Sequence, residues 1–189
     1  MKPPSLRVIA GRLRGRRFLA PKGQDTRPSL EKTRGMIFDV LAARYDLSLY
    51  QGADLFAGSG ALGLEAYSRG AEPVVFTETG GAFGPLSATL NQLLPQGAFF
   101  LAKQDALKWL KLCPPGAAKP WLLLLDPPYQ SGQGHMALQE ISRRFEVFLG
   151  ALVVLEASRA TEPPALDHLH LWSSKLVGQS RVDFFLVEP

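Results

Sequence analysis

The feature that most constrains the fold is a regular alternation of strand-like and helix-like segments from residue 51 onward. Short apolar runs bounded by turn residues predict strands at 53–56, 73–77, 98–102, 121–125 and 151–155. Apolar residues at helical spacing predict the intervening helices at 62–69, 82–94, 106–112 and 136–148. This alternation is typical of βαβ units, whose parallel strands form a sheet with helices on both faces. We therefore expect an α/β domain.

The carboxyl end departs from the alternation. Two strand-like runs, 168–177 and 181–187, are joined by Gly178-Gln179-Ser180, which predicts an antiparallel hairpin at one edge of the sheet. The expected organisation is a basic N-terminal extension at 1–28 and one α/β domain at 29–189.

The amino end is expected to form a second, small hairpin. Its strand-like runs, 6–10 and 16–20, flank a connection with glycine at both ends, residues 11–15. Ser29 is a suitable N-cap for a helix that extends to about residue 44.

Basic charge is concentrated at this end of the chain. Residues 1–34 contain ten Lys and Arg against Asp25 and Glu31, a net charge of +8, and the whole chain carries +4, so residues 35–189 sum to −4. Such a concentration is typical of proteins that bind a nucleic-acid backbone, although a solvated arm without a partner is the alternative. Arg27 is equally suited to closing over a cofactor. The residues expected to contact nucleic acid are Arg12, Arg14, Arg16, Arg17, Arg27, Arg34 and Arg181.

Several classes of protein are disfavoured by the composition. A single cysteine, Cys113, excludes an intramolecular disulfide, and the three histidines show no metal-ligand spacing, so we expect no metal. No apolar run approaches the roughly 20 residues of a membrane helix, and no signal peptide is evident. We expect a soluble cytoplasmic protein, most simply a monomer.

A glycine-rich loop predicts a nucleotide site. Gly58, Gly60 and Gly63 form a G-x-G-x-x-G pattern between an expected strand and an expected helix, where glycines allow a nucleotide to approach the backbone. Glu78, twenty residues after Gly58, is suited to holding ribose hydroxyls. Both features fit a dinucleotide as well as an adenosyl cofactor.

Two carboxylates favour the adenosyl cofactor. Asp54, at the exit of the strand, suits a cationic amino-acid group better than a pyrophosphate. Asp105 can accept from an adenine amine, and Ala106 can donate its backbone N–H, although Asp105 is equally suited to capping a helix. The expected cofactor-binding residues are Asp54, Phe56, Gly58, Gly60, Glu78, Asp105 and Ala106.

The motif Asp126-Pro127-Pro128-Tyr129 follows the apolar run 121–125. Two prolines stiffen the chain at the end of the predicted strand. A fixed carboxylate, a directed carbonyl and a flat ring together suit a planar group with an exocyclic NH₂. The alternative is that Asp126 only begins a turn and that Tyr129 is merely half-buried.

Taken in order, these motifs resemble those of the class I S-adenosylmethionine-dependent methyltransferases. The chain is most similar to the RsmD family of bacterial 16S rRNA guanine-N2 methyltransferases. The resemblance is carried by 7–11 with 15–17, 26–28, 54–70, 126–129 and 178–185. One departure is Thr79-Gly80-Gly81, where the family usually has charged or polar residues.

The resemblance implies a Rossmann-like fold with a mostly parallel seven-stranded sheet and S-adenosylmethionine as the cofactor. It also implies the 16S rRNA of the small ribosomal subunit as the partner. Asp126 and the Pro127 carbonyl would accept the two N–H groups of the guanine amine, and Tyr129 would stack on the base. These three residues are the expected catalytic residues, and the base must leave its helix or loop to reach them.

Other functions remain open from sequence alone. Adenine N6 and the glutamine side chain of a protein also offer a planar NH₂. The glycine loop by itself also fits a nicotinamide-dependent oxidoreductase, which would leave Asp126–Tyr129 and the basic end unexplained. A non-catalytic RNA-binding module that kept the fold is the remaining alternative.

Overall fold

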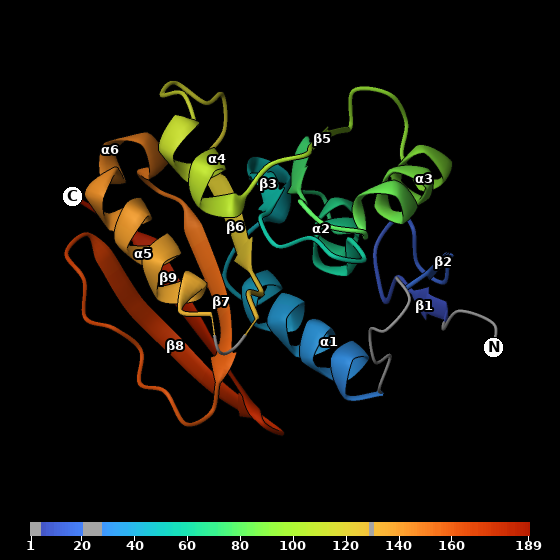
Figure 1. Cartoon of the computed structure of the whole chain (residues 1–189). Helices are drawn as coiled ribbons and strands as arrows, with labels where there is room; N and C mark the ends of the chain where they lie inside the picture. Colours follow the sequence, from blue (N-terminus) through green and yellow to red (C-terminus); the bar gives the residue numbers. More distant parts are fainter. Residues whose placement is uncertain (1–4, 21–27, 129–130) are drawn as a thin grey trace.

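The computed structural model describes residues 5–20, 28–128 and 131–189 (Figure 1). The strands of the main sheet are β3 (Gln51–Asp54), β4 (Val74–Thr77), β5 (Phe99–Ala102), β6 (Trp121–Leu125), β7 (Leu152–Ser158), β8 (Leu169–Val177) and β9 (Ser180–Val187). Their order across the sheet is β5-β4-β3-β6-β7-β9-β8. The first five strands along the chain run parallel, and β9 pairs antiparallel with both β7 and β8. The predicted fold class is therefore confirmed.

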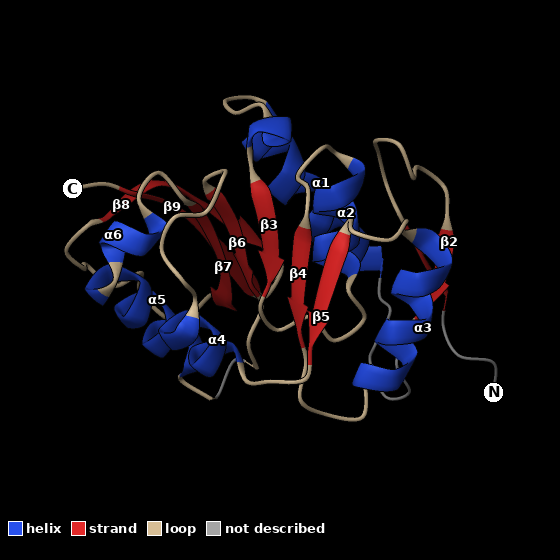
Figure 2. Cartoon of the chain, turned by 90° about the horizontal axis from the view of Figure 1, so that it is seen from above, coloured by secondary structure: helices blue, strands red, loops and turns tan. Residues whose placement is uncertain are grey.

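Helices cover both faces of this sheet (Figure 2). They are α1 (Pro28–Ala42), α2 (Ala61–Ser68), α3 (Phe83–Leu93), α4 (Ala106–Leu112), α5 (Gln133–Arg143) and α6 (Phe145–Phe148), with a 3₁₀ turn η1 (Leu47–Leu49). On one face, α1 packs Phe38 against Leu124 and its neighbours in β6. On the other face, α5 packs Ile141 into a cluster that contains Leu125. Because β6 is buried on both sides, all five of its residues are apolar.

The expected helix 136–148 is interrupted at Arg144, which divides it into α5 and α6. The guanidinium of Arg144 donates to the carbonyl oxygens of Leu110 and Cys113, the latter at 2.8 Å, at the end of α4. Carbonyls at a helix end have no partner within the helix, so this contact holds the break in place.

The N-terminal hairpin has shorter strands than expected, β1 (Ser5–Arg7) and β2 (Arg17–Leu19). Beyond β1 the backbone N–H groups of Ile9 and Ala10 donate to the carboxylate of Glu65 in α2, at 2.8 and 3.0 Å, instead of pairing across the hairpin. Leu6, Val8, Phe18 and Ala20 pack into one apolar cluster with residues of α2, α3 and β4.

The turn of the hairpin lies directly on α2. Gly11 has a φ of +79°, and a Cβ there would lie 1.9 Å from the backbone oxygen of Ser68, so only glycine fits. Within the described part of the chain, no helix is long and apolar enough to cross a membrane.

Candidate active site

The strand order reverses between β3 and β6, the two strands at the middle of the sheet. In open α/β sheets, ligands bind in the crevice at the carboxyl ends of the strands at such a reversal. A cavity of about 430 Å³ lies there, within the roughly 300–1,000 Å³ usual for small-molecule sites. Its lining includes the predicted residues Phe56, Gly58, Glu78, Asp105, Ala106, Asp126 and Pro127.

The glycine loop joins β3 to α2 through a backbone that excludes larger residues. Gly58 and Gly60 have positive φ, and a Cβ on Gly60 would lie 2.6 Å from a side-chain carbon of Leu86. A Cβ on Gly63 would lie 2.3 Å from the Phe76 ring. Gly60 is not among the residues that line the cavity, so its contact with a cofactor stays a prediction.

Asp54, the last residue of β3, is hydrogen-bonded to the last glycine of this motif. Its side chain is 1% exposed, and its Oδ2 accepts a hydrogen bond of 2.8 Å from the backbone N–H of Gly63. Burial, only partly offset by this hydrogen bond, raises the pKa of Asp54 to about 7. At this strand end Leu55 and Phe56 line the cavity, and Asp54 is not among the lining residues. Direct contact of Asp54 with a ligand therefore stays a prediction.

Glu78 follows β4 and ties two loops together. Its Oε2 accepts from the N–H of Gly58 at 3.0 Å, and its Oε1 accepts from the N–H of Gly80 at 2.7 Å. The departure from the family pattern at 79–81 thus supplies a glycine N–H that fixes this carboxylate. Each carboxylate oxygen has a second lone pair, so Glu78 can still accept from hydroxyl groups in the cavity.

Asp105 has the capping role that the sequence left open. Its Oδ1 accepts from the N–H of Lys108 at 3.1 Å at the start of α4. Asp105 and Ala106 also line the cavity, so the cap and a cofactor contact are compatible.

Asp126 follows β6 immediately and is exposed at the lining of the cavity. Pro127 beside it is buried. The removal of water by the surrounding protein raises the pKa of the Asp126 carboxyl, and the negative charges of Glu156 and then Asp54 raise it further. Tyr129, like Arg27, lies outside the described residues.

Glu156 was missed by the sequence reasoning. It lies in β7, one residue beyond the pair Leu125 and Leu155 of the β6–β7 register, and is therefore the neighbour of Asp126 on the next strand. The available signal was its position, because Asp54, Glu78 and Asp126 also stand at or just after the ends of expected strands.

The predicted nucleic-acid residues fall into different settings. Arg14, Arg16 and Arg17 are exposed on the N-terminal hairpin. Arg12 is also exposed, but its guanidinium lies 3.5 Å from the centre of the Tyr67 ring and 2.8 Å from Glu72 Oε2.

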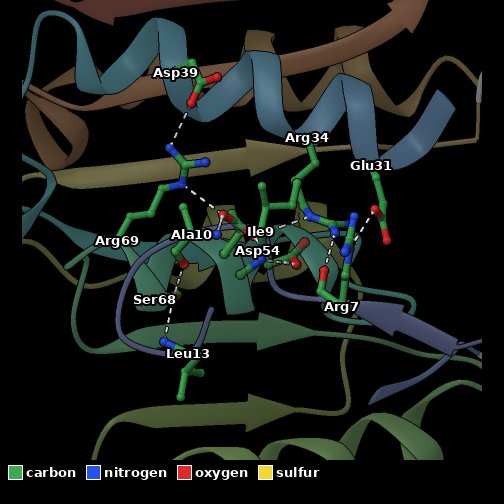
Figure 3. Close-up of polar contacts among 12 residues, drawn as sticks. Arg7, Ile9, Ala10, Leu13, Glu31, Arg34, Asp39, Asp54, Ser68 and Arg69 are labelled. Carbon is green, nitrogen blue, oxygen red and sulfur yellow. Dashed lines mark hydrogen bonds and ion pairs between the residues drawn. The ribbon is translucent and has the colours of Figure 1, made fainter. Parts of the chain in front are cut away.

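Two of the predicted RNA contacts, Arg34 and Arg181, are buried. Arg34 is 4% exposed, lies 3.6 Å from the carboxylate of Glu65 and donates to the carbonyl of Arg7 at 2.7 Å (Figure 3). Arg181 is 6% exposed and is held by the carboxylate of Asp183 through Nε and Nη2. Both guanidinium groups therefore have partners inside the protein, and a contact of either with RNA stays a prediction. Within residues 5–20, 28–128 and 131–189, no three or more His, Cys, Asp or Glu side chains are grouped so that they could hold a metal ion.

Comparison with known proteins places the chain in a family. The family model described as "Conserved hypothetical protein 95" matches residues 6–186. The "Putative rRNA methyltransferase YlbH" of Bacillus subtilis is 31% identical over 160 residues, which cover 84% of this chain and 86% of that protein. The "Ribosomal RNA small subunit methyltransferase D" of Escherichia coli is 32% identical over 129 residues, 67% of this chain and 62% of that one.

A solved structure agrees with these matches. The "Putative methyltransferase yhhF" of Escherichia coli superposes with a TM-score of 0.81 and 27% identity over 98% of this chain and 99% of that one. The chain therefore belongs to the family described as Conserved hypothetical protein 95, and within it to the RsmD type of methyltransferase that its motifs resemble.

Proposed function

We propose that this protein transfers a methyl group from S-adenosylmethionine to the exocyclic N2 amine of a guanine in the 16S rRNA of the small ribosomal subunit. The proposal is supported by the names of its relatives, which describe rRNA methyltransferases, and by the chemistry of the cavity. The observation that carries it is the position of Asp126. Its carboxylate faces a cofactor-sized cavity at the reversal of the sheet, next to a rigid pair of prolines.

The residues around the cavity suit the cofactor. Glu78 offers acceptors for ribose hydroxyls, and Asp105 with the N–H of Ala106 matches the amine and ring nitrogen of adenine. S-adenosylmethionine, when bound, supplies a methyl group on a positively charged sulfonium, which the amine nitrogen displaces. Its positive charge also compensates the carboxylates at the strand ends, where negative charge is otherwise costly.

Asp126 and Pro127 prepare the amine for this displacement. The lone pair of the guanine N2 is delocalised into the ring, which makes the amine a weak nucleophile. Accepting its two N–H groups at the Asp126 carboxylate and the Pro127 carbonyl favours a pyramidal nitrogen and directs its lone pair. The proton leaves after the new bond has made the nitrogen acidic, so Asp126 acts by positioning and need not be a strong base.

The first test is methyl transfer from radiolabelled S-adenosylmethionine to unmodified small ribosomal subunits, with purified 16S rRNA, duplex DNA and a protein extract in parallel. The label is digested to nucleosides and identified. We expect N2-methylguanosine from subunits or rRNA. Label in N6-methyladenosine or methylglutamine would overturn the proposed substrate, and absence of label despite cofactor binding would favour a non-catalytic RNA-binding module.

The exposed arginines of the hairpin supply the proposed contacts to the rRNA backbone. Changing Arg14, Arg16 and Arg17 together to Gln should weaken RNA binding and lower the slope of log affinity against log salt by about 2–3, because each lost phosphate contact removes about 0.7–0.9. A control with the same charge change is Lys108→Gln, Lys111→Gln and Lys175→Gln, three exposed lysines outside the hairpin. An equal slope for the hairpin variant and the wild type would remove the hairpin from RNA binding.

A further inference from the structure

The guanidinium of Arg12, in the turn of the N-terminal hairpin, lies flat on an aromatic ring of α2. Its central carbon is 3.5 Å from the centre of the Tyr67 ring, which is van der Waals contact for two carbon atoms. A guanidinium that met the ring edge-on would hold its central carbon farther away, because a nitrogen would stand between them. The two planes are therefore stacked, and Tyr67 itself is only 4% exposed.

Hydrogen bonds fix the orientation of this plane. Arg12 Nε donates to the carbonyl oxygen of Tyr67 at 3.1 Å, and Nη2 donates to Oε2 of Glu72 at 2.8 Å. The backbone is also held, because the N–H of Arg12 donates to the carbonyl oxygen of Ser68 at 2.8 Å. Much of the rotamer freedom of this side chain is thus lost before any ligand binds, which lowers the entropic cost of binding.

The other face of the guanidinium is open to a ligand. The side chain of Arg12 is 42% exposed although Tyr67 covers one face of its plane. Glu72 already compensates the positive charge and would repel a phosphate group brought to the same guanidinium. A flat ring needs only the open face, and aromatic rings, including nucleobases, stack favourably on arginine planes.

The surroundings of this open face favour RNA as the source of the ring. Arg14, Arg16 and Arg17 are exposed on the same hairpin, and the N–H of Arg14 donates to the carbonyl oxygen of Gly11 within the same turn. Basic residues that follow a backbone, combined with planar groups on which bases stack, are typical of sites for single-stranded nucleic acid. Bases inside a duplex are already stacked on both sides, so the base must be unpaired.

We infer that the stacked pair of Arg12 and Tyr67 is a platform for an unpaired base of the RNA. The base lies on the open face of the Arg12 guanidinium while the neighbouring arginines contact phosphates. This inference rests on the proposed function and adds a contact to the RNA outside the cavity in which the target base is methylated. Stacking is tolerant of sequence, so the platform holds the RNA without selecting a particular base.

Two substitutions at Arg12 separate the effect of a planar group from the effect of charge. Arg12→Lys keeps the charge and loses the plane, whereas Arg12→Tyr keeps a flat ring and loses the charge. In titrations with unmodified 16S rRNA transcript, Arg12→Lys should raise the Kd by about 5-fold or more, the lower end of the contribution of base stacking. Its slope of log affinity against log salt should equal that of the wild type. Arg12→Tyr should bind more tightly than Arg12→Lys.

The matched control is the same pair of changes at Arg14, which is exposed in the same turn. A residue that contacts phosphate through its charge should give the opposite order. Arg14→Lys should therefore bind the transcript more tightly than Arg14→Tyr. The unfolding midpoint of each variant is measured in parallel, so that a loss of folding is not mistaken for a loss of the RNA contact.

A second measurement does not depend on the folding of Arg12→Tyr. The wild type and Arg12→Lys are titrated with single-stranded oligoadenylate and with an abasic oligonucleotide of the same length. The two probes carry the same number of phosphates, so the ratio of their Kd values reports on the bases. The wild type should prefer oligoadenylate by about 5-fold or more, and Arg12→Lys should reduce this preference.

The outcomes separate this inference from the proposed function. If the wild type makes no N2-methylguanosine, the proposed function fails. The platform fails while the proposed function stands if the wild type makes it and Arg12→Lys binds the transcript as tightly as the wild type or keeps the wild-type preference for oligoadenylate. It also fails if Arg12→Lys binds the transcript more tightly than Arg12→Tyr when both have the same unfolding midpoint.

Discussion

Two regions of this molecule differ in whether their buried carboxylates have compensating cations and hydrogen-bond donors. Under the N-terminal hairpin, the carboxylate of Glu65 is fully buried and fully occupied. It accepts from the backbone of Ile9 and Ala10, forms a 2.9 Å ion pair with Arg69 and lies 3.6 Å from Arg34 (Figure 3). Its negative charge is balanced by two cations and two backbone donors.

At the carboxyl ends of β3, β6 and β7, the carboxylates of Asp54, Asp126 and Glu156 lie close enough to interact electrostatically. Asp54 accepts a backbone N–H from Gly63, yet its pKa rises to about 7 because burial outweighs that contact. Asp126 interacts unfavourably with both Glu156 and Asp54. The pKa values of Asp54 and Asp126 are therefore both raised, which means that the ionised forms of these two carboxyls are disfavoured.

This difference in charge compensation distinguishes a region that stabilises the fold from a region that is suited to binding a ligand. A balanced buried charge fixes the position of one segment on another, whereas a concentrated charge of one sign raises the free energy of the empty site and is compensated by the ligand. Active sites often carry such a cost in stability. Substitutions in the two regions should therefore affect different measurements.

The largest effect is expected for Asp126→Ala on catalysis. The change removes the acceptor that orients the amine, so kcat should fall by roughly 10²-fold or more, the loss expected when a reacting group is misplaced by about 1 Å. Because the change also removes charge repulsion, the free energy of unfolding should stay equal or increase. Single-turnover methyl transfer, urea unfolding and calorimetric titration with S-adenosylmethionine measure the three quantities. A large loss of cofactor affinity or of stability would instead indicate a structural role for Asp126.

Glu65→Gln should have the opposite profile. It leaves Arg34 and Arg69 without their buried counter-charge, and breaking such a pair usually costs about 3–5 kcal/mol of unfolding free energy. The matched control is Glu31→Gln, which disrupts the partly exposed pair of Glu31 with Arg7 at 3.2 Å and should cost under about 1 kcal/mol. Equal losses for the two variants in urea unfolding would mean that the Glu65 cluster is not an anchor.

The contrast also explains what was predictable from the sequence. The buried run of β6, the glycine loop and Asp126 are encoded by neighbours within a few residues, so local patterns identified them. Glu65 is part of an ordinary helical pattern, and its partners Ile9 and Ala10 lie 56 and 55 residues away. Only the tertiary fold brings them together.

The same limit explains why the burial of Arg34 was not predicted. In the sequence it was one basic residue among many in a basic segment. Its burial follows from α1 packing beside α2, which carries Glu65. Glu156, by contrast, stood at a recognisable strand end, and only the pairing of β6 with β7 shows that it is the neighbour of Asp126.

The most specific expected effect, and the smallest at any single step of one pH unit, is the pH dependence of stability at Asp54. Its pKa is raised from 3.8 to about 7 in the folded protein, so the folded state binds more protons than the unfolded state between these values. Stability should therefore be highest near and below pH 4 as far as this group is concerned. It should fall as the pH rises to about 7, by at most about 1.4 kcal/mol per pH unit.

Asp54→Asn isolates this contribution, because the amide oxygen can still accept the N–H of Gly63 while the group no longer ionises. Unfolding free energies measured in urea at pH 5, 6, 7 and 8 should fall less steeply for this variant than for the wild type, with the difference confined to pH values up to about 7. Parallel curves for the two proteins would mean that Asp54 ionises at its ordinary pKa. The contrast between the compensated carboxylate of Glu65 and those at the strand ends would then rest on Asp126 alone.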